Sequence, residues 1–381
     1  MRVVRVVPLR DGRPNGILAC VAESTSALAE VYAVTVALPR SSSLLRSDSF
    51  PGADVVSLPR LERRRWAALV RGAEVVVIEA AWNRYAFLAA RACRSAGVPY
   101  VVTPHGGYSV MAWRGSRIRR WKKRAYWWGV ERWIVRHASG LWWSSDLERD
   151  LSRRPGLDGP REAVVAFPVR DLGGAAAVPS ATTGGTSTDR AAVAAGGLHV
   201  VTVCLLRPLK HLEILLEAVA LLIREGRPIR LTIAGSGASS YARDIRNLCD
   251  GLGLAEHVQW LGSISGEEVG ELLAGADVYC CPGVESFGVA VGEALSAGLP
   301  VILSDQVGIA ASVTSHGAGT VVPLGDVVAL ADALRSVRAR ERGAANPSRS
   351  LYEKSLTRGV FREAFTGAFV ADLSVRSRQL Q

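Results

Sequence analysis

Short apolar runs alternate with amphipathic segments along most of this 381-residue chain. In the first 170 residues, runs bounded by glycine or proline and rich in β-branched residues include RVVRVVP, YAVTVALP, AEVVVIEA and PYVVTPHGG. Such continuous runs predict buried parallel strands, and the segments between them, with apolar residues at a period near 3.6, predict crossover helices. The pattern indicates a doubly wound α/β domain.

A second domain of the same kind is predicted after a break in the pattern. Residues 171–198 are rich in glycine, alanine, serine and threonine, which predicts a flexible linker. The alternation then resumes with HVVTVCLL, IRLTIAG, VQWLG, DVYCCPG and PVILSD. We therefore expect domains over 1–170 and 199–345, with the loops at the carboxyl ends of their strands facing a cleft between them.

Composition narrows the class of protein. Apolar residues make up 49% of the chain and charged residues 21%, which is typical of a folded globular protein rather than a disordered or fibrous one. No apolar run approaches the roughly 20 residues that span a bilayer, and the start lacks a signal-peptide core, so we expect a cytoplasmic protein. The six cysteines show no metal-ligand spacing and predict buried thiols, with no metal site.

The formal charge of +11 is concentrated in one segment. Residues 111–136 carry nine lysines and arginines against one acid, and seven of the ten tryptophans lie between Trp113 and Trp143. Cations beside tryptophan on a helix suit the surface of an anionic membrane. Alternatively, the tryptophans pack into the core beneath a solvated basic face. A nucleic-acid partner is not expected, because no nucleic-acid-binding motif accompanies the segment. The predicted membrane or acceptor surface consists of Arg117, Arg120, Trp121, Lys123 and Arg124.

Two glutamates stand among small residues in PGVESFGVAVGEALSAGLP, residues 282–300. Glu285 is predicted to lie in the loop after a strand, and Glu293 in the following helix, which begins near Gly288. The N–H groups at this helix start favour phosphate, and Gly288 lets a ligand approach the backbone. Ionised carboxylates accept hydrogen bonds from sugar or ribose hydroxyls. The segment therefore predicts a nucleotide-sugar site, unless both glutamates are ordinary surface acids.

The longer stretch PGVESFGVAVGEALSAGLPVILSD strongly resembles the nucleotide-binding motif of family-4 retaining glycosyltransferases, also called glycosyl transferases group 1. The resemblance continues through IAGSG, HVQWLG, DQVGIAASV and GAGTVVPLGDVVALADAL, and more loosely through VVTPHGGYS in the first half. It implies the GT-B fold, in which two Rossmann-like doubly wound domains face an interdomain cleft. It also implies that residues 346–381 form a C-terminal helix that crosses back to the N-terminal domain.

The resemblance also implies roles for individual residues. Glu285 resembles the glutamate that contacts the donor sugar, Glu293 the one that accepts from the ribose, and Lys210 the lysine that faces the diphosphate. His105 resembles a histidine that contacts the donor sugar, so the catalytic set is His105, Lys210 and Glu285. Gly12 and Gly16 resemble the first-domain loop that approaches the phosphates. The implied donor-binding set is Gly16, Arg207, Lys210, Gly235, Glu285, Ser286, Phe287, Gly288, Val289 and Glu293.

One position departs from the family pattern. The family usually has an arginine five residues before the lysine, where this chain has Leu205; Arg207 lies only three residues before Lys210. Either Arg207 takes over this phosphate contact or the contact is missing. The family often has glycine where this chain has His211.

The expected activity is retaining transfer of a sugar from a nucleotide-diphosphate sugar to an acceptor hydroxyl, without metal or cofactor. We expect same-face substitution, in which the leaving phosphate helps to deprotonate the acceptor. The expected acceptor is a lipid-linked or polysaccharide-precursor glycan at the cytoplasmic face of the membrane, where the enzyme would bind peripherally. Two alternatives remain: a catalytically silent partner subunit, or a nonhydrolysing nucleotide-sugar epimerase.

Overall fold

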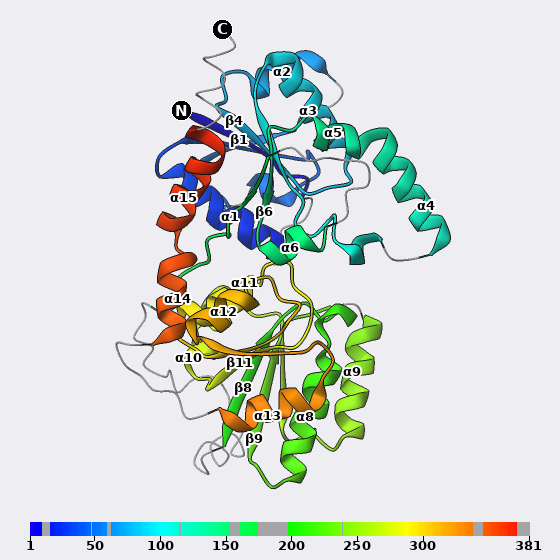
Figure 1. Ribbon diagram of the computed structural model, residues 1–381, viewed down its shortest axis with the longest axis vertical. Helices are drawn as coiled ribbons and strands as arrows, with labels where there is room; N and C mark the ends of the chain where they lie inside the picture. Colours follow the sequence, from blue (N-terminus) through cyan, green and yellow to red (C-terminus); the bar gives the residue numbers. More distant parts are fainter. Residues whose placement is uncertain are drawn as a thin grey trace. The chain divides into compact units, whose positions relative to one another are not determined.

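The computed structural model divides into two compact units (Figure 1). Unit 1 comprises Met1–Pro168 and the segment from Leu356 onward, and unit 2 comprises Val169–Ser355. Gly12 and most of the predicted linker lie outside the described residues. The described residues are 1–9, 16–46, 48–58, 62–113, 116–152, 161–173, 197–237, 239–337 and 346–371.

Unit 1 is built on a seven-stranded sheet in the order β3-β2-β1-β4-β5-β6-β7, with every neighbouring pair parallel. The inner strands are buried on both faces, as expected for β-branched runs covered by helices on both sides. The strands are β1 (Arg2–Val6), β2 (Ala33–Leu38), β3 (Ala53–Ser57), β4 (Val75–Glu79), β5 (Tyr100–Thr103), β6 (Gly140–Trp143) and β7 (Glu162–Val164).

Helices cover both faces of this sheet. One face packs against α2, α3 and α5 in a single core cluster. On the other face, α15 packs along α1, and Trp142 of β6 lies against three phenylalanines of the C-terminal segment, Phe361, Phe365 and Phe369. The helices are α1 (Gly16–Ala29), α2 (Arg63–Val70), α3 (Arg84–Ala96), α4 (Arg117–Tyr126), the π-helix η3 (Trp127–Glu131), α5 (Arg132–Arg136), α6 (Asp146–Asp150), α15 (Arg358–Thr366) and the π-helix η5 (Gly367–Ala371), with short 3₁₀ turns η1 (Ser43–Arg46) and η2 (Val110–Trp113).

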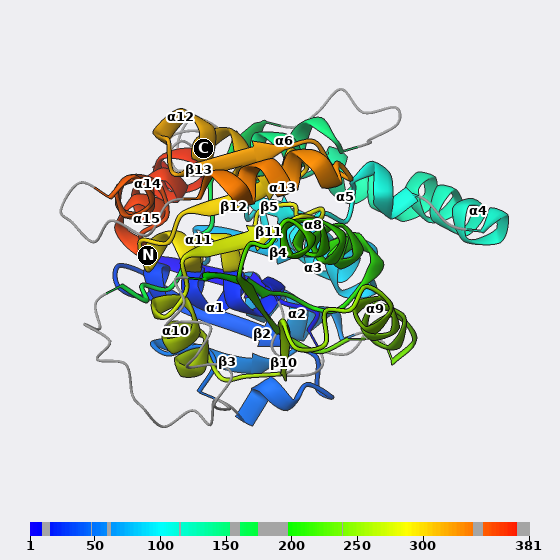
Figure 2. The same cartoon turned by 90° about the horizontal axis from the view of Figure 1, so that it is seen from below.

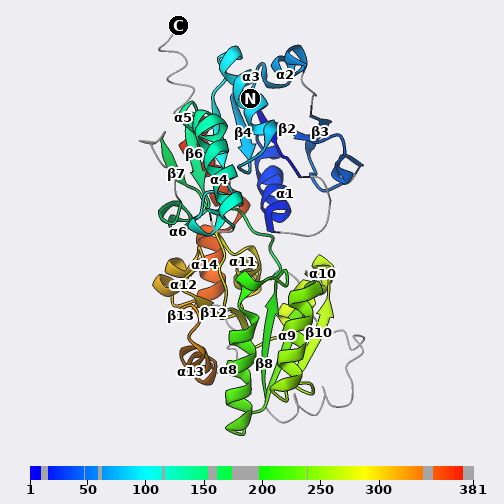
Figure 3. The same ribbon diagram turned by 90° about the vertical axis from the view of Figure 1, so that its right-hand side faces the viewer.

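Unit 2 has a six-stranded parallel sheet in the order β10-β9-β8-β11-β12-β13. Helices α8, α9 and α13 share one core cluster with the sheet, and α8 and α9 lie together along it (Figure 3). Helix α14 packs against α11 and α12. The strands are β8 (Leu198–Val203), β9 (Ile229–Ala234), β10 (Val258–Gly262), β11 (Val278–Cys281), β12 (Val301–Ser304) and β13 (Gly319–Val322); the helices are η4 (Pro208–Lys210), α8 (Leu212–Arg224), α9 (Ser239–Gly251), α10 (Gly266–Ala274), α11 (Val289–Ser296), α12 (Ala310–His316), α13 (Val327–Ser336) and α14 (Pro347–Ser355).

Both sheets reverse their strand order between the first and fourth strands, β1 and β4 in unit 1 and β8 and β11 in unit 2. This is the switch point of a doubly wound fold, beyond whose carboxyl ends such sheets bind ligands. The prediction of two Rossmann-like α/β domains is therefore confirmed. Among the described residues, no helix is long and apolar enough to cross a membrane.

Candidate functional site

The unit 2 site lies where the loops after β8 and β11 meet at the switch point. The Val284 N–H donates to the Leu209 carbonyl at 2.8 Å, which ties the second loop to η4. Glycine is needed for this approach, because a Cβ on Gly283 would lie 2.4 Å from the Leu209 carbonyl oxygen and 2.5 Å from Cα of Lys210. Two loops more than 70 residues apart in the sequence are thus held in direct backbone contact.

This contact brings Lys210 and Glu285 together. The Lys210 ammonium donates to Oε1 of Glu285, and both side chains are partly exposed, at 15% and 32%. The Glu285 backbone is fixed on both sides, since its N–H donates to Gln306 and its carbonyl accepts from Gly308. The pair is therefore held in position while remaining accessible to a ligand.

Helix α11 begins directly after this loop. Its N-cap residue Gly288 has φ 108°, a conformation that favours glycine, and a Cβ there would press on Val307 and Val291. The first intrahelical bond runs from the Gly292 N–H to the Gly288 carbonyl, so the preceding N–H groups belong to the helix start. No side chain caps them at Gly288, which leaves the start of α11 suited to an anion. Ser286 is half-buried, Phe287 is buried, and Val289 is half-buried as the first residue of the helix.

Glu293 lies within α11, two turns beyond Glu285. Its carboxylate Oε1 accepts a hydrogen bond at 3.1 Å from Arg170, which also donates to the Gly266 carbonyl. Arg170 was not anticipated from the sequence, because it lies in an irregular segment more than 100 residues away. The only indication in the sequence was a single arginine directly after FPV, residues 167–169.

The start of the loop after β8 lies against the start of the loop after β9, and a glycine makes this approach possible. Gly235, at φ 131°, has no room for a Cβ, which would lie 1.8 Å from the Cys204 carbonyl oxygen. Leu206 forms an isolated parallel bridge to Gly237, directly before Arg207. Leu205 is half-buried and Arg207 is exposed, and no carboxylate in the described part of the chain pairs with Arg207.

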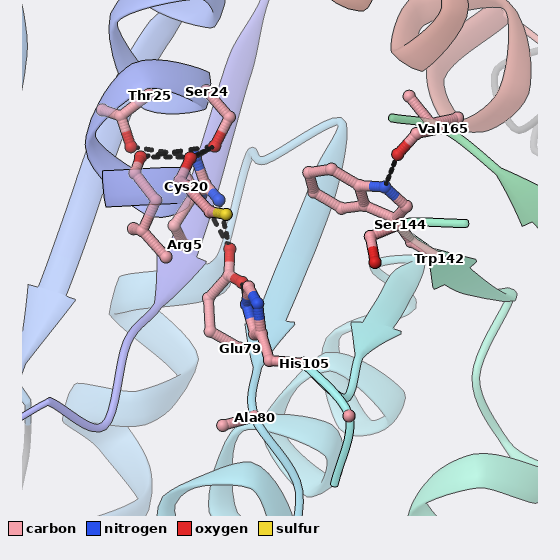
Figure 4. A network of polar contacts seen from close by, with 12 residues as sticks. Arg5, Cys20, Ser24, Thr25, Glu79, Ala80, His105, Trp142, Ser144 and Val165 are labelled. Atoms are coloured by element: carbon pink, nitrogen blue, oxygen red, sulfur yellow. Dashed lines mark hydrogen bonds and ion pairs between the residues drawn. The ribbon is translucent and has the colours of Figure 1, made fainter. Parts of the chain in front are cut away.

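In unit 1, His105 lies at the carboxyl end of β5 in a buried polar network that Figure 4 shows. Its Nε2 lies 2.7 Å from Oε2 of Glu79, at the end of β4, and its ring stacks on Phe167. Arg5, in β1, donates to Oε1 of Glu79 from Nε at 2.9 Å and reaches Ser24 and Thr25 of α1. His105 also has φ 48°, an uncommon backbone conformation for a residue other than glycine.

The electrostatics of this network determine the direction of the hydrogen bond between His105 and Glu79. Burial alone would raise the pKa of Glu79, but the charge of Arg5 and the hydrogen bonds from His105 and Arg5 outweigh it and hold the pKa below its usual value. The ionised carboxylate only accepts hydrogen bonds, so Nε2 of His105 donates to it. Nδ1 is therefore the ring nitrogen that Glu79 does not engage. Arg5 and Glu79 were not predicted as part of the site, although each is a charged residue in an otherwise mostly apolar strand.

The loop around His105 is held by a second carboxylate. Glu148 accepts from the Gly106 N–H at 2.5 Å and from the Ser144 N–H at 2.9 Å. Gly107 allows close packing, because a Cβ there would lie 2.8 Å from the Pro104 carbonyl oxygen. Gly16 differs: it begins α1, and a Cβ there would meet open space. The loop before it, with Gly12, is outside the described residues.

The basic segment forms α4, which extends away from the sheet of its own unit (Figures 1 and 2). Trp121 is 70% exposed, and Arg117, Arg120 and Arg124 are also exposed, on one stripe of the helix. Lys123 departs from this set. It is half-buried, donates to the Ala112 carbonyl and lies over the Trp82 ring, 5.0 Å from its centroid. The segment also contributes to the core, because Trp127 is fully buried.

Comparison with known proteins identifies the family. The model described as "Glycosyl transferases group 1" matches residues 192–353, and the one described as "Glycosyl transferase 4-like domain" matches residues 3–169. The chain is 35% identical over 129 residues to phosphatidyl-myo-inositol mannosyltransferase of Mycobacterium leprae, covering 33% of each protein. It is 33% identical over 159 residues to GDP-mannose-dependent alpha-(1-6)-phosphatidylinositol monomannoside mannosyltransferase of Mycolicibacterium smegmatis, covering 39% of this chain and 41% of that one.

These alignments span only a third to two fifths of the length of the curated relatives. Among solved structures, HepE of Anabaena in complex with UDP superposes with a TM-score of 0.72 at 16% identity, over 96% of this chain and 99% of that one. At this identity the likeness shows the fold alone. The group 1 model matches the unit that holds Lys210 and Glu285, and the 4-like model matches the other unit. This chain therefore belongs to the family-4 glycosyltransferases of the GT-B fold.

Proposed function

We propose that this protein is a retaining, metal-independent glycosyltransferase that moves a sugar from a nucleoside diphosphate to an acceptor hydroxyl. The observation that carries the proposal is the convergence of Lys210, Glu285 and the start of α11 at the switch point of unit 2. A cation and a helix start suit a diphosphate, and a half-exposed carboxylate suits sugar hydroxyls. Lys210 and Glu285 pair with each other, and a donor would bind between these two charges.

The chemical step follows from the placement of these charges. The bond between the sugar C1 and the diphosphate oxygen breaks, and Lys210 with the start of α11 stabilises the negative charge that develops on the leaving diphosphate. The acceptor oxygen bonds to C1 on the same face, and its proton passes to the leaving phosphate. Glu285 holds sugar hydroxyls in this mechanism and forms no covalent bond. Trapping a glycosyl adduct on a glutamate would contradict this step.

Arg207 is proposed as the second cation for the diphosphate. Side chains alternate along an extended chain, so we expect Arg207, two residues after Leu205, to face the same side. Arg207 is exposed and has an extended backbone, with φ −144° and ψ 152°. Arg207 can therefore contact the diphosphate in place of the family's arginine, which is Leu205 in this chain. We expect Arg207→Ala to weaken donor binding about tenfold, which is the loss of one charge-assisted hydrogen bond.

A lipid-linked or polysaccharide-precursor acceptor is proposed, with peripheral binding at the cytoplasmic face of the membrane. The exposed stripe of Arg117, Arg120, Trp121 and Arg124 suits an anionic lipid surface. The relative from Mycobacterium leprae is named for a phosphatidylinositol acceptor, which agrees with this assignment. Changing the three arginines to glutamine should reduce co-sedimentation with vesicles containing phosphatidylglycerol, whereas the same charge loss at Arg63, Arg64 and Arg65 of α2 should not.

The decisive experiment measures release of nucleoside diphosphate across a panel of UDP- and GDP-sugars, with lipid extract as acceptor. Glu285→Ala should abolish transfer because it removes the acceptor for the sugar hydroxyls, whereas Glu256→Ala, at an exposed glutamate elsewhere in unit 2, should leave it unchanged. Retention is read from the anomeric configuration of the product, and metal independence from activity in EDTA. If the wild-type protein neither binds nor turns over any donor at millimolar concentration, the proposed function is wrong.

A further inference from the structure

Unit 1 contains a groove of about 390 Å³ between α4 and the loop after β4. It is separate from the polar network around His105 but adjoins the same loops, since Trp82 Nε1 donates to the Gly107 carbonyl at 2.7 Å. The groove belongs neither to the donor site of unit 2 nor to the exposed stripe of α4. Its lining includes Trp82, Ile118, Arg119, Lys122, Lys123 and Tyr126.

The groove is lined by one particular face of α4. Arg119, Lys122, Lys123 and Tyr126 follow the i, i+3, i+4, i+7 spacing of a single helical stripe. Arg117, Arg120, Trp121 and Arg124 follow the same spacing two residues earlier, on the outer stripe. The helix therefore presents two cationic stripes, one that lines the groove and one outside its lining.

The cations of the groove lack negative partners. Helix α4 has six lysines and arginines and no acid. Among the described residues, no carboxylate forms an ion pair with Arg119, Lys122 or Lys123. Burial, and then the charge of Arg119, lowers the pKa of Lys123, so a bound anion would relieve repulsion at this point. Clustered cations in a concave site concentrate the field on an anionic ligand.

The wall of the groove opposite α4 is rigid. Trp82 has φ 63°, and its N–H donates to Glu131, a buried carboxylate that also accepts from the Tyr108 hydroxyl at 2.7 Å. The Trp82 ring packs edge-on against Tyr108 and Trp113. Strained backbone held by buried partners is concentrated at functional sites. The wall is thus preorganised without a ligand.

An apolar rim adjoins the cations. Ile118 lines the groove although it is 69% exposed, and the exposed Trp121 lies one helical turn further along α4. A ligand with an anionic group and an attached hydrocarbon chain would contact both kinds of surface. A free phosphate ester would use the cations only and leave Ile118 in water.

We propose that this groove holds the phosphate of a lipid-linked acceptor, with Arg119, Lys122 and Lys123 contacting the phosphate and Ile118 the lipid chain. The inference rests on the proposed function, because it names the part of the acceptor that the enzyme recognises. It also assigns the two stripes of α4 different tasks. The outer stripe binds the membrane surface, and the inner stripe selects one phosphate-bearing molecule from it.

The test measures binding of dihexanoylphosphatidylglycerol, below its micelle concentration, to the full chain by tryptophan fluorescence. The double variant Arg119→Gln/Lys122→Gln should weaken binding about tenfold or more, because it removes two charge-assisted hydrogen bonds. The charge-matched variant Arg120→Gln/Arg124→Gln, on the outer stripe, should change the affinity less than about twofold while weakening vesicle binding. Glycerol 3-phosphate should bind more weakly than the lipid and with the same dependence on Arg119 and Lys122.

The outcomes separate the groove from the general charge of α4. Equal losses in both double variants, or no binding by the wild-type protein, would overturn the assignment. Equal affinity for glycerol 3-phosphate and the lipid would overturn the lipid source. Hydrolysis of the donor without acceptor does not need the groove, so the groove variant should keep it while raising KM for the lipid acceptor. If no donor is bound or turned over, the proposed function fails, whereas the lipid titration still decides the groove.

Discussion

Replacing Gly283 with alanine tests whether backbone contact between two loops positions the donor site. An added Cβ would lie 2.4 to 2.6 Å from the Leu209 carbonyl oxygen and from Cα and C of Lys210. Normal contacts with carbon are about 3.5 Å, so the loops would have to separate by about 1 Å. The obstructing atoms are backbone, which cannot move aside as a flexible side chain can.

The consequences can be estimated from this displacement. The hydrogen bond from Val284 to Leu209, now 2.8 Å, would stretch beyond its useful range, and Lys210 would move relative to Glu285. Overpacking of this kind costs about 1–3 kcal/mol of stability. A displacement of about 1 Å at a reacting centre can cost about 100-fold in rate. We therefore expect a larger effect on turnover than on thermal stability.

The assay compares Gly283→Ala with Gly251→Ala by nucleotide titration calorimetry, steady-state turnover and thermal unfolding. Gly251 lies at the end of α9, where a Cβ would meet nothing within 4 Å and alanine favours the helix. The control should therefore match or slightly exceed the wild type in stability and turn over donor normally. If Gly283→Ala binds nucleotide and turns over like the control, the loops do not position the site as the structure implies.

Three further predictions concern charged side chains. Lys210→Ala should lower kcat about 100- to 1,000-fold by removing a stabiliser of the leaving diphosphate, as measured by steady-state product release; an unchanged kcat would exclude this role. Glu79→Ala should cost about 3–5 kcal/mol in urea unfolding, because it leaves Arg5, which is 0% exposed, without its counter-charge; Glu62→Ala, on the surface, should cost less than about 1 kcal/mol. Burial raises the pKa of Glu131 from 4.5 to about 7, so the folded protein retains a proton that the unfolded chain loses, and wild-type stability should fall as the pH rises between these values. Glu131→Gln lacks this titration, so its free energy of unfolding should rise by about 2–3 kcal/mol relative to that of the wild type as the pH goes from 5 to 8. Parallel pH profiles of the two proteins would contradict a raised pKa of Glu131.

The strand, loop and helix around Glu285 could be predicted from the local sequence pattern. The run DVYCCPG, a loop with Glu285 and a helix from about Gly288 were predicted from β-branched content and glycine placement, and the structure has β11, the loop and α11 in this order. The proximity of Lys210 could only be expected from the family resemblance. It results from the pairing of β8 with β11, a contact between strands far apart in the sequence.

Contacts between distant parts of the chain could not be predicted from the sequence. The periodicity of α4 separates its two stripes, but nothing in the sequence indicates that Lys123 turns inward toward Trp82, because that depends on the loop after β4. Arg170 and Glu293 come together through a contact across more than 100 residues. Such pairs follow from chain topology and carry no mark in local composition.

The sequence by itself determined the alternation of strands and helices, the family and the candidate donor residues, because hydrophobic period and glycine positions are local properties of the chain. Tertiary structure alone decided the neighbours of each charge. Arg5 and Glu79 are charged residues in mostly apolar strands, and the pairing of β1 with β4 places one beside the other. That pairing, with His105 from β5, turns three isolated polar residues into one buried network, since only a folded sheet brings the ends of its strands together.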